Sequence, residues 1–286
     1  YWIDSVVRTA ILTDNDDLLR VVMGQIEKSF AEDGDDFVGP IEIKENKRTN
    51  RWAHAVYFRA IYALWSKTGD DKYLQRIRRH YLQDKLFDYA SSRDIVNIET
   101  MFKLSELFGD NRLFDMAVKA YDKYSETDRS TSMKSLLGDG VPNEHGVTYN
   151  EDSKLGAIVY SYTGNKKALF SSINAYKKLD NYDILPDGVN SSSEKTCGNE
   201  SYRTHESCDI SDFTWSVGYL LEATGDAKYA DWIEKACFNA LPGAMTEYFT
   251  AIQYLSCVNQ VICARNSTHT DPWQNTPRMA YQPHHY

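Results

Sequence analysis

Residues 68–81 read T-G-D-D-K-Y-L-Q-R-I-R-R-H-Y, and they follow an apolar run that extends from Ala53 to Trp65. Glycine accepts the left-handed backbone that ends one helix, and an aspartate or asparagine after it accepts hydrogen bonds from the free N–H groups that begin the next helix. Apolar residues then recur at i, i+1, i+4 and about i+8, the spacing of one helical face. The segment therefore predicts a hairpin of two α-helices.

The same pattern recurs along the chain at a spacing of roughly 40 to 60 residues. Copies contain Phe108-Gly109-Asp110, Thr163-Gly164-Asn165 and Thr224-Gly225-Asp226, and a weaker copy contains Thr13-Asp14-Asn15. The helix before the turn is sometimes apolar nearly all round, as an inner helix would be, and the helix after it is amphipathic. We therefore predict an all-α fold, an α/α toroid of the six-hairpin barrel type in complete or incomplete form. An open superhelical solenoid is the competing architecture.

Polar residues on the expected inner helices favour the toroid. His54 lies on one such helix, and His145 lies just ahead of another. We expect both to line a central cavity and to contact the substrate, while the alternative for each is a structural role with satisfied hydrogen bonds. We also expect residues 1–286 to form one domain, with a small β-like segment at 252–261 near its C-terminal end.

Composition narrows the class of partner. The formal net charge is −9 without any run of Lys or Arg, which argues against nucleic acid and against an anionic membrane surface. No apolar run is long enough to span a membrane. Aromatic residues make up 13% of the chain, including 20 Tyr and 6 Trp, and such side chains stack on sugar rings. The composition is thus compatible with a carbohydrate partner.

The five cysteines are an odd number, all lie after residue 196, and none forms a C-x-x-C pair. Both a disulfide framework and a zinc finger are therefore poor interpretations. The chain begins at Tyr1 without an initiator Met or a signal peptide, so we expect a fragment of a longer protein, and the ends do not indicate a compartment.

Residues 193–208 concentrate three carboxylates, two thiols and a histidine in one predicted loop. In an extended backbone, Glu206 and Cys208 would point the same way and could bind one metal ion together. Zinc accepts carboxylate and thiolate ligands. Ser207 and Asp209 are both plausible N-caps and predict that a helix begins directly after this motif. The alternative is a loop carboxylate and a buried thiol without a metal.

The region from Thr204 to Ala240 resembles the glycoside hydrolases of family 127 and their relatives in families 142 and 146. The resemblance extends over most of the chain, in the family's order. It is carried by these segments: Gly39-Pro40, Trp52, Thr68-Gly69-Asp70, His145-Gly146-Val147, Lys154, Pro186-Asp187-Gly188, Ser193-Glu194, Thr204-His205-Glu206-Ser207-Cys208 and Ala223-Thr224-Gly225-Asp226.

This resemblance implies a role for each matching residue. Glu206 and Cys208 correspond to two zinc ligands, and Glu194 corresponds to the general acid/base. The remaining two ligands in the family are an adjacent Cys-Cys pair, one member of which is the nucleophile. No Cys-Cys pair occurs in this sequence, so we expect the nucleophile beyond Tyr286 or replaced, and zinc to bind weakly or not at all.

The leading interpretation is a retaining exo-glycosidase acting on L-arabinofuranoside-like substrates. A uronyl hydrolase or a sugar epimerase on the same toroid would need its own carboxylate or histidine pair and would not need Cys208. A non-catalytic helical sugar-binding scaffold is the third hypothesis. Which sugar is bound does not follow from any local motif.

Overall fold

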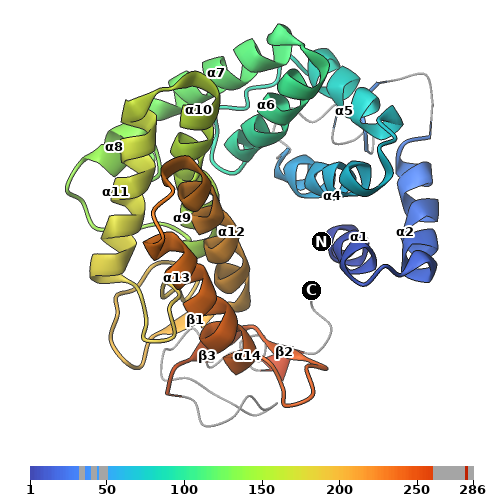
Figure 1. Ribbon diagram of the computed structural model, residues 1–286. Helices are drawn as coiled ribbons and strands as arrows, with labels where there is room; N and C mark the ends of the chain where they lie inside the picture. The colour runs from blue at the N-terminus through green and yellow to red at the C-terminus, as the bar shows by residue number, and fades with distance from the viewer. Residues whose placement is uncertain (32–35, 40–43, 45–50, 260–280, 283–286) are drawn as a thin grey trace. The chain divides into compact units, whose positions relative to one another are not determined.

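The computed structural model describes residues 1–31, 36–39, 44, 51–259 and 281–282. The chain divides into two compact units, an N-terminal unit that ends at Tyr124 and a C-terminal unit that begins at Ser125. The expectation that residues 1–286 form one domain stays a prediction. Most of the described residues are helical, as Figure 1 shows, which confirms the prediction of a mostly α-helical chain.

The N-terminal unit is built from α-helices and one 3₁₀ turn. Its elements are α1 (Trp2–Leu12), α2 (Asp16–Ser29), α4 (Trp52–Thr68), α5 (Lys72–Gln83), the 3₁₀ turn η1 (Asp94–Val96), α6 (Asn97–Phe108) and α7 (Asn111–Ser125), whose last residue belongs to the next unit.

The C-terminal unit combines helices with short strands. Its helices are α8 (Met133–Leu137), α9 (Gly146–Ser153), α10 (Leu155–Thr163), α11 (Lys166–Tyr182), α12 (Ser207–Thr224), α13 (Lys228–Lys235), the π-helix η2 (Ala236–Ala240) and α14 (Leu241–Gly243). Its strands are β1 (Thr204–Glu206), β2 (Ile252–Gln253), β3 (Leu255–Cys257) and β4 (Tyr281–Gln282).

The predicted hairpin turns have the geometry that the sequence requires. Gly69, Gly109, Gly164 and Gly225 end α4, α6, α10 and α12 with φ angles of 70°, 62°, 72° and 67°. At the third turn, the Asn165 side chain accepts hydrogen bonds from the backbone amides of the first turn of α11. The local chemistry of Gly followed by Asp or Asn therefore sets these helix boundaries.

Apolar side chains from α9 to α14 form the core of the C-terminal unit. The members include Tyr149, Ala157, Ala175, Tyr176, Leu179, Val189, Ile210, Phe213, Val217, Leu220, Tyr229, Ala236 and Ala240. Helix α9 is buried along its whole length, as predicted for an inner helix. This core holds the N-termini of α9 and α12, where the predicted site residues lie.

Two short antiparallel strand pairs cover part of this unit. Strand β1 pairs with β3, with Thr204 opposite Cys257, His205 opposite Ser256 and Glu206 opposite Leu255. Strand β2 pairs with β4. In its described part, residues 252–259, the predicted β-like segment contains the strands β2 and β3, and residues 260 and 261 lie outside the described residues. None of the described helices is long and apolar enough to cross a membrane.

Candidate active site

Backbone hydrogen bonds in the C-terminal unit join the predicted loop to the start of α9. The Gly146 amide donates to the Glu194 carbonyl at 2.9 Å, and the Thr196 amide donates to the Glu144 carbonyl, also at 2.9 Å. Tyr254, which lies between β2 and β3, joins them from the C-terminal part of the unit, where its carbonyl accepts a hydrogen bond from the Ser207 amide at 2.9 Å. Segments about 50 residues apart in the sequence thus meet at one place.

Three of the predicted site residues, His145, Glu194 and Glu206, come together there. Their nitrogen and carboxylate oxygen atoms lie within 4.8 Å of one another. His145 Nε2 lies 3.5 Å from Glu194 Oε2 and 3.4 Å from Glu206 Oε1. The Glu206 side chain is 2% exposed, whereas those of Glu194 and His145 are 29% and 24% exposed. One buried and one accessible carboxylate therefore flank the same imidazole.

Hydrogen bonding orients the His145 ring. Its Nδ1 accepts a hydrogen bond from the Thr148 amide at 3.3 Å, because His145 is the N-cap of α9. In the neutral ring the proton is then on Nε2, the nitrogen that faces the two carboxylates. His145 is thus placed to donate a hydrogen bond toward Glu194 and Glu206.

Tyr254 belongs to this cluster but is not predicted from the sequence. Its hydroxyl lies 3.1 Å from Glu206 Oε2 and 3.5 Å from Glu194 Oε1, so it links the two carboxylates. It is one of 20 tyrosines, and no motif distinguishes it. Tyr254 reaches the site because it directly precedes β3, which pairs with β1. The one indirect indication in the sequence is the alternating pattern that predicts a β-like segment at 252–261.

The backbone of Glu194 is in an unusual conformation, with a φ angle of 77°. A non-glycine residue in the left-handed region costs free energy, on the order of 1 kcal/mol or more. Strain of this kind persists only where surrounding contacts impose it, and it is concentrated at functional sites. Here the Gly146 amide donates a hydrogen bond to the Glu194 carbonyl and helps to hold the backbone in this conformation.

A buried polar residue, Asp209, lies beside the cluster in the first turn of α12. Burial, together with the negative charge of Glu206, raises the pKa of Asp209 to about 7. Asn190 Nδ2 donates to Asp209 Oδ1 at 3.3 Å. A Cβ atom on Gly146 would lie 2.6 Å from that oxygen and 2.6 Å from Ser192 Cβ, so only glycine fits at the start of α9.

The extended segment ends at Glu206, and α12 begins at Ser207, earlier than predicted. Cys208 is therefore on the helix, and the expectation that Glu206 and Cys208 share one face of a strand is wrong. Cys208 is half-buried in the first helical turn, and it is not in the group formed by His145, Glu194 and Glu206. Its role as a zinc ligand stays a prediction.

The donor atoms present can still accommodate a zinc ion at Glu206. Glu206 Oε1 is buried and makes no hydrogen bond of good geometry with the described residues, although His145 Nε2 lies 3.4 Å from it, so a cation at this oxygen would compensate its charge. Carboxylate oxygen and thiolate sulfur are both zinc ligands. Among the described residues, His145, Glu194 and Glu206 have possible ligand atoms within 4.8 Å of one another, and His145 would bind an ion through Nε2 only without the proton on that nitrogen.

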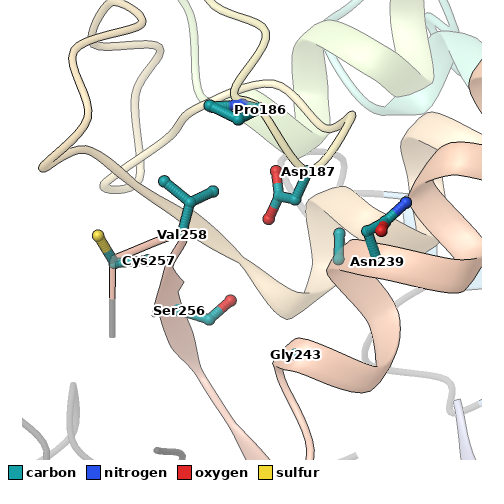
Figure 2. A pocket seen from close by; sticks show the side chains of 8 residues that line it. Pro186, Asp187, Asn239, Gly243, Ser256, Cys257 and Val258 are labelled. Carbon is teal, nitrogen blue, oxygen red and sulfur yellow. The ribbon is translucent and has the colours of Figure 1, made fainter. Parts of the chain in front are cut away.

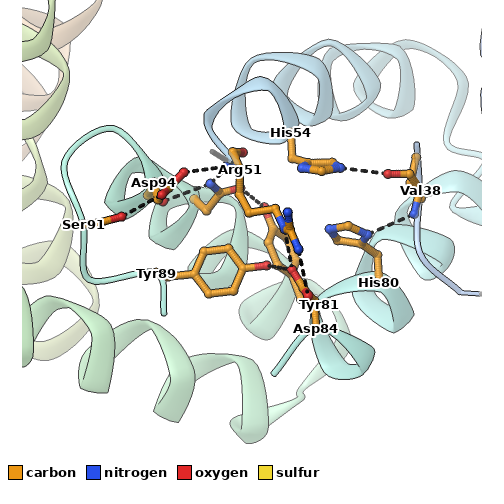
Figure 3. A network of polar contacts seen from close by, with 10 residues as sticks. Val38, Arg51, His54, His80, Tyr81, Asp84, Tyr89, Ser91 and Asp94 are labelled. Atoms are coloured by element: carbon orange, nitrogen blue, oxygen red, sulfur yellow. Dashed lines mark hydrogen bonds and ion pairs between the residues drawn. The ribbon is translucent and has the colours of Figure 1, made fainter. Parts of the chain in front are cut away.

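His54 lies in the N-terminal unit, in a buried network shown in Figure 3. Its Nε2 donates to the Val38 carbonyl at 2.8 Å, while His80 Nδ1 accepts from the Val38 amide at 3.0 Å. The ring packs against Phe37 and Phe58, each with a centroid distance of 5.3 Å. Burial is the main cause that lowers the pKa of His54 to about 4. The substrate-contact role stays a prediction, beside an evident packing role.

No protein-family model matches this sequence, and no curated protein matches it. The fold, however, is similar to those of solved structures. A glycoside hydrolase has a TM-score of 0.71 and 14% identity, over 95% of this chain and 49% of its own. A GH127 β-L-arabinofuranosidase from Geobacillus stearothermophilus T6 has a TM-score of 0.70 and 14% identity, over 90% of this chain and 48% of its own.

A sugar epimerase from a ruminal bacterium has a TM-score of 0.63 and 11% identity, and the match covers 91% of this chain and 79% of that one. Sequence identities of 11–14% show a shared fold, and that fold is the predicted α/α-toroid class. The resemblance to the GH127 enzymes is therefore confirmed at the level of the fold. The chain spans about half the length of the two glycoside hydrolases.

Proposed function

We propose that this chain is the helical part of a retaining exo-glycosidase, with Glu194 as general acid/base. The observation that supports this most is the convergence of His145, Glu194 and Glu206 within 4.8 Å, with Tyr254 linking the two carboxylates. Two carboxyl groups placed like those of Glu194 and Glu206 can protonate a leaving oxygen and stabilise positive charge at an anomeric carbon. The similar fold of a β-L-arabinofuranosidase suggests L-arabinofuranoside-like substrates.

In this proposal Glu194 first protonates the leaving oxygen and then acts as the base that activates water, whereas the nucleophile is a thiolate and not Glu206. Two successive displacements at the anomeric carbon retain its configuration. Glu194 is the more exposed and is therefore the better candidate to meet the leaving group.

In this proposal zinc would be held by Glu206 and Cys208 together with ligands from outside these residues. When bound, the ion would supply the positive charge that lowers a thiol pKa, so that a thiolate nucleophile exists at neutral pH. The family resemblance assigns that nucleophile to a Cys-Cys pair, which this sequence lacks, and we place it outside these 286 residues. His145 and Tyr254 would orient the carboxylates and bind sugar hydroxyls.

A second candidate function is a sugar epimerase, and a uronyl hydrolase on the same toroid is a related alternative. The epimerase is favoured by the match that covers 79% of an epimerase chain, and by a site where His145 and Glu194 could act as an acid–base pair without Cys208. A non-catalytic sugar-binding scaffold would use the same polar groups for recognition alone.

The decisive experiment measures turnover of p-nitrophenyl glycosides, including the β-L-arabinofuranoside, by the full-length protein. Glu194→Gln keeps the shape of the side chain, and we expect it to lower kcat/KM by at least about 100-fold. Cys208→Ser should lower the zinc content measured by elemental analysis. NMR of the first-formed sugar anomer should show retention.

Three results would contradict the proposal. Unchanged turnover in Glu194→Gln would remove this residue from the acid/base role. Conversion of a free sugar into its epimer, without release of p-nitrophenol, would favour the epimerase. Sugar binding without any turnover in the full-length protein would favour the scaffold.

A further inference from the structure

The opposite face of strand β1 carries a second set of polar residues. His205 and Ser256 are directly opposite each other in the β1–β3 register, and partners in an antiparallel pair point to the same face. Glu206 is the next residue along the strand and therefore points to the other face. The residues around His205 are thus separate from the cluster around Glu206.

A serine, a histidine and an aspartate form a continuous hydrogen-bonded chain on this face. Ser256 Oγ lies 3.0 Å from His205 Nδ1, and His205 Nε2 lies 2.6 Å from Asp187 Oδ2. A carboxylate oxygen such as Asp187 Oδ2 is an acceptor, so His205 Nε2 donates to it and Nδ1 accepts from the serine hydroxyl. A nucleophile, a base in hydrogen-bond reach of it and a third group that orients the base are the marks of an activated serine.

These residues adjoin a cavity of about 330 Å³, which Ser256 and Asp187 both line. Figure 2 shows them on different sides of this space, with Asn239 of the π-helix η2 at a third side. Pro186, Ala240 and Val258 supply apolar wall. The volume suits a small ligand, and the His205 side chain is 1% exposed, so bulk water does not reach the base directly.

Asn239 supplies a donor that such a site needs. Its side chain is exposed, and its amide nitrogen donates one hydrogen bond, to the Lys235 carbonyl at 2.7 Å. An amide group has two N–H donors, and rotation of this exposed side chain would direct the second toward an oxygen bound in the cavity. A side-chain amide of this kind stabilises the oxyanion of an acyl-transfer intermediate.

From this geometry we propose that Ser256, His205 and Asp187 form a second catalytic centre that hydrolyses esters of short carboxylic acids. Ser256 Oγ attacks the ester carbonyl carbon while its proton moves to His205 Nδ1. The carbon–oxygen bond to the alcohol breaks, and the alcohol leaves with that proton. Water then attacks the acyl-serine, His205 takes the water proton and returns it to Ser256, and the carboxylic acid is released. This activity does not depend on the proposed glycosidase function.

The test uses p-nitrophenyl acetate and a fluorophosphonate probe on the purified full-length protein. We expect peptide mass spectrometry to find the probe on Ser256. Ser256→Ala should abolish labelling and lower ester hydrolysis by about 1,000-fold, and His205→Gln should lower it by at least about 100-fold. Ser211→Ala, which changes an exposed serine of α12, is the matched control and should hydrolyse at the wild-type rate.

Two further measurements keep the test decisive if the Ser256 or His205 variants do not fold. Labelling of the wild-type protein needs no variant, and Asn239→Ala changes an exposed side chain and should lower hydrolysis by about 100-fold. The proposal is overturned if the wild-type protein carries no probe on Ser256, or if Ser256→Ala or Asn239→Ala hydrolyses the ester at the wild-type rate.

Discussion

The packing of α10 against α11 leads to a quantitative prediction about Gly156. A Cβ atom at this position would lie 2.2 Å from the Ala168 carbonyl oxygen, which is backbone of the neighbouring helix. It would also lie 2.7 Å from Ser172 Oγ and 2.8 Å from Ser171 Oγ. The shortest contacts that Cβ atoms tolerate are about 3.0 Å, so Gly156→Ala must displace α11 or α10 by nearly 1 Å.

The matched substitution is Gly218→Ala in α12, where an added Cβ would have no atom within 4 Å. Both changes gain helix propensity, up to about 1 kcal/mol, and this gain largely cancels in the comparison. Forcing an extra carbon into a packed site costs about 1–3 kcal/mol. Because backbone must move, we expect Gly156→Ala to be less stable than Gly218→Ala by about 3 kcal/mol.

Urea unfolding followed by far-UV circular dichroism measures this difference, and hydrogen exchange at the α10 and α11 amides shows whether the loss is local. The melting temperatures should differ by about 6 °C, on the scale of about 2 °C per kcal/mol for a chain of this size. Equal stability of the two variants, within about 0.5 kcal/mol, would refute the packing argument.

Three further outcomes are expected. Folding lowers the pKa of His54 from 6.5 to about 4, so the stability that depends on the neutral His54 ring is complete above pH 6.5 and is lost as the pH falls toward 4. Urea unfolding at a series of pH values should show a loss of about 3 kcal/mol over this range, and His54→Gln should reduce that loss. Tyr254→Phe should lower glycosidase kcat/KM by about 10- to 100-fold, with a melting temperature close to that of the wild type, because only the hydroxyl that links the carboxylates is removed. Asn165→Ala should cost about 1 kcal/mol in thermal unfolding because α11 loses its N-cap, and an unchanged melting temperature would contradict that role.

Local chemistry explains why the hairpins could be predicted from the sequence. A glycine such as Gly164 and the asparagine after it act on amides within a few residues, so the pattern and the structure agree. The resemblance also identified Glu194 and Glu206, and the position of His145 just ahead of an expected inner helix identified that residue. Their convergence depends on hydrogen bonds between segments about 50 residues apart, which no local pattern encodes.

The errors have physical causes of the same kind. The capping preferences of Ser207 and Asp209 predict a later start for α12 than the structure has. The N-cap is Glu206, whose side chain makes no capping hydrogen bond, so no capping signal marks this position in the sequence. His54 is a different case: its substrate-contact role stays a prediction, and its hydrogen bond to a backbone carbonyl 16 residues earlier gives it a packing role in the N-terminal unit. Tyr254 was missed because strand pairing alone brings it to the carboxylates.

The position of Tyr254 also bears on the order in which the protein is synthesised and folds. Glu194 and Glu206 precede it by 60 and 48 residues, so the helices from α8 to α12 leave the ribosome well before their tyrosine partner. Contacts that close such long loops form late in folding, because the chain loses conformational entropy on closing the loop before the new contacts stabilise it. A nascent chain that has not reached β3 can therefore hold packed helical hairpins while its two carboxylates still lack the hydroxyl that joins them.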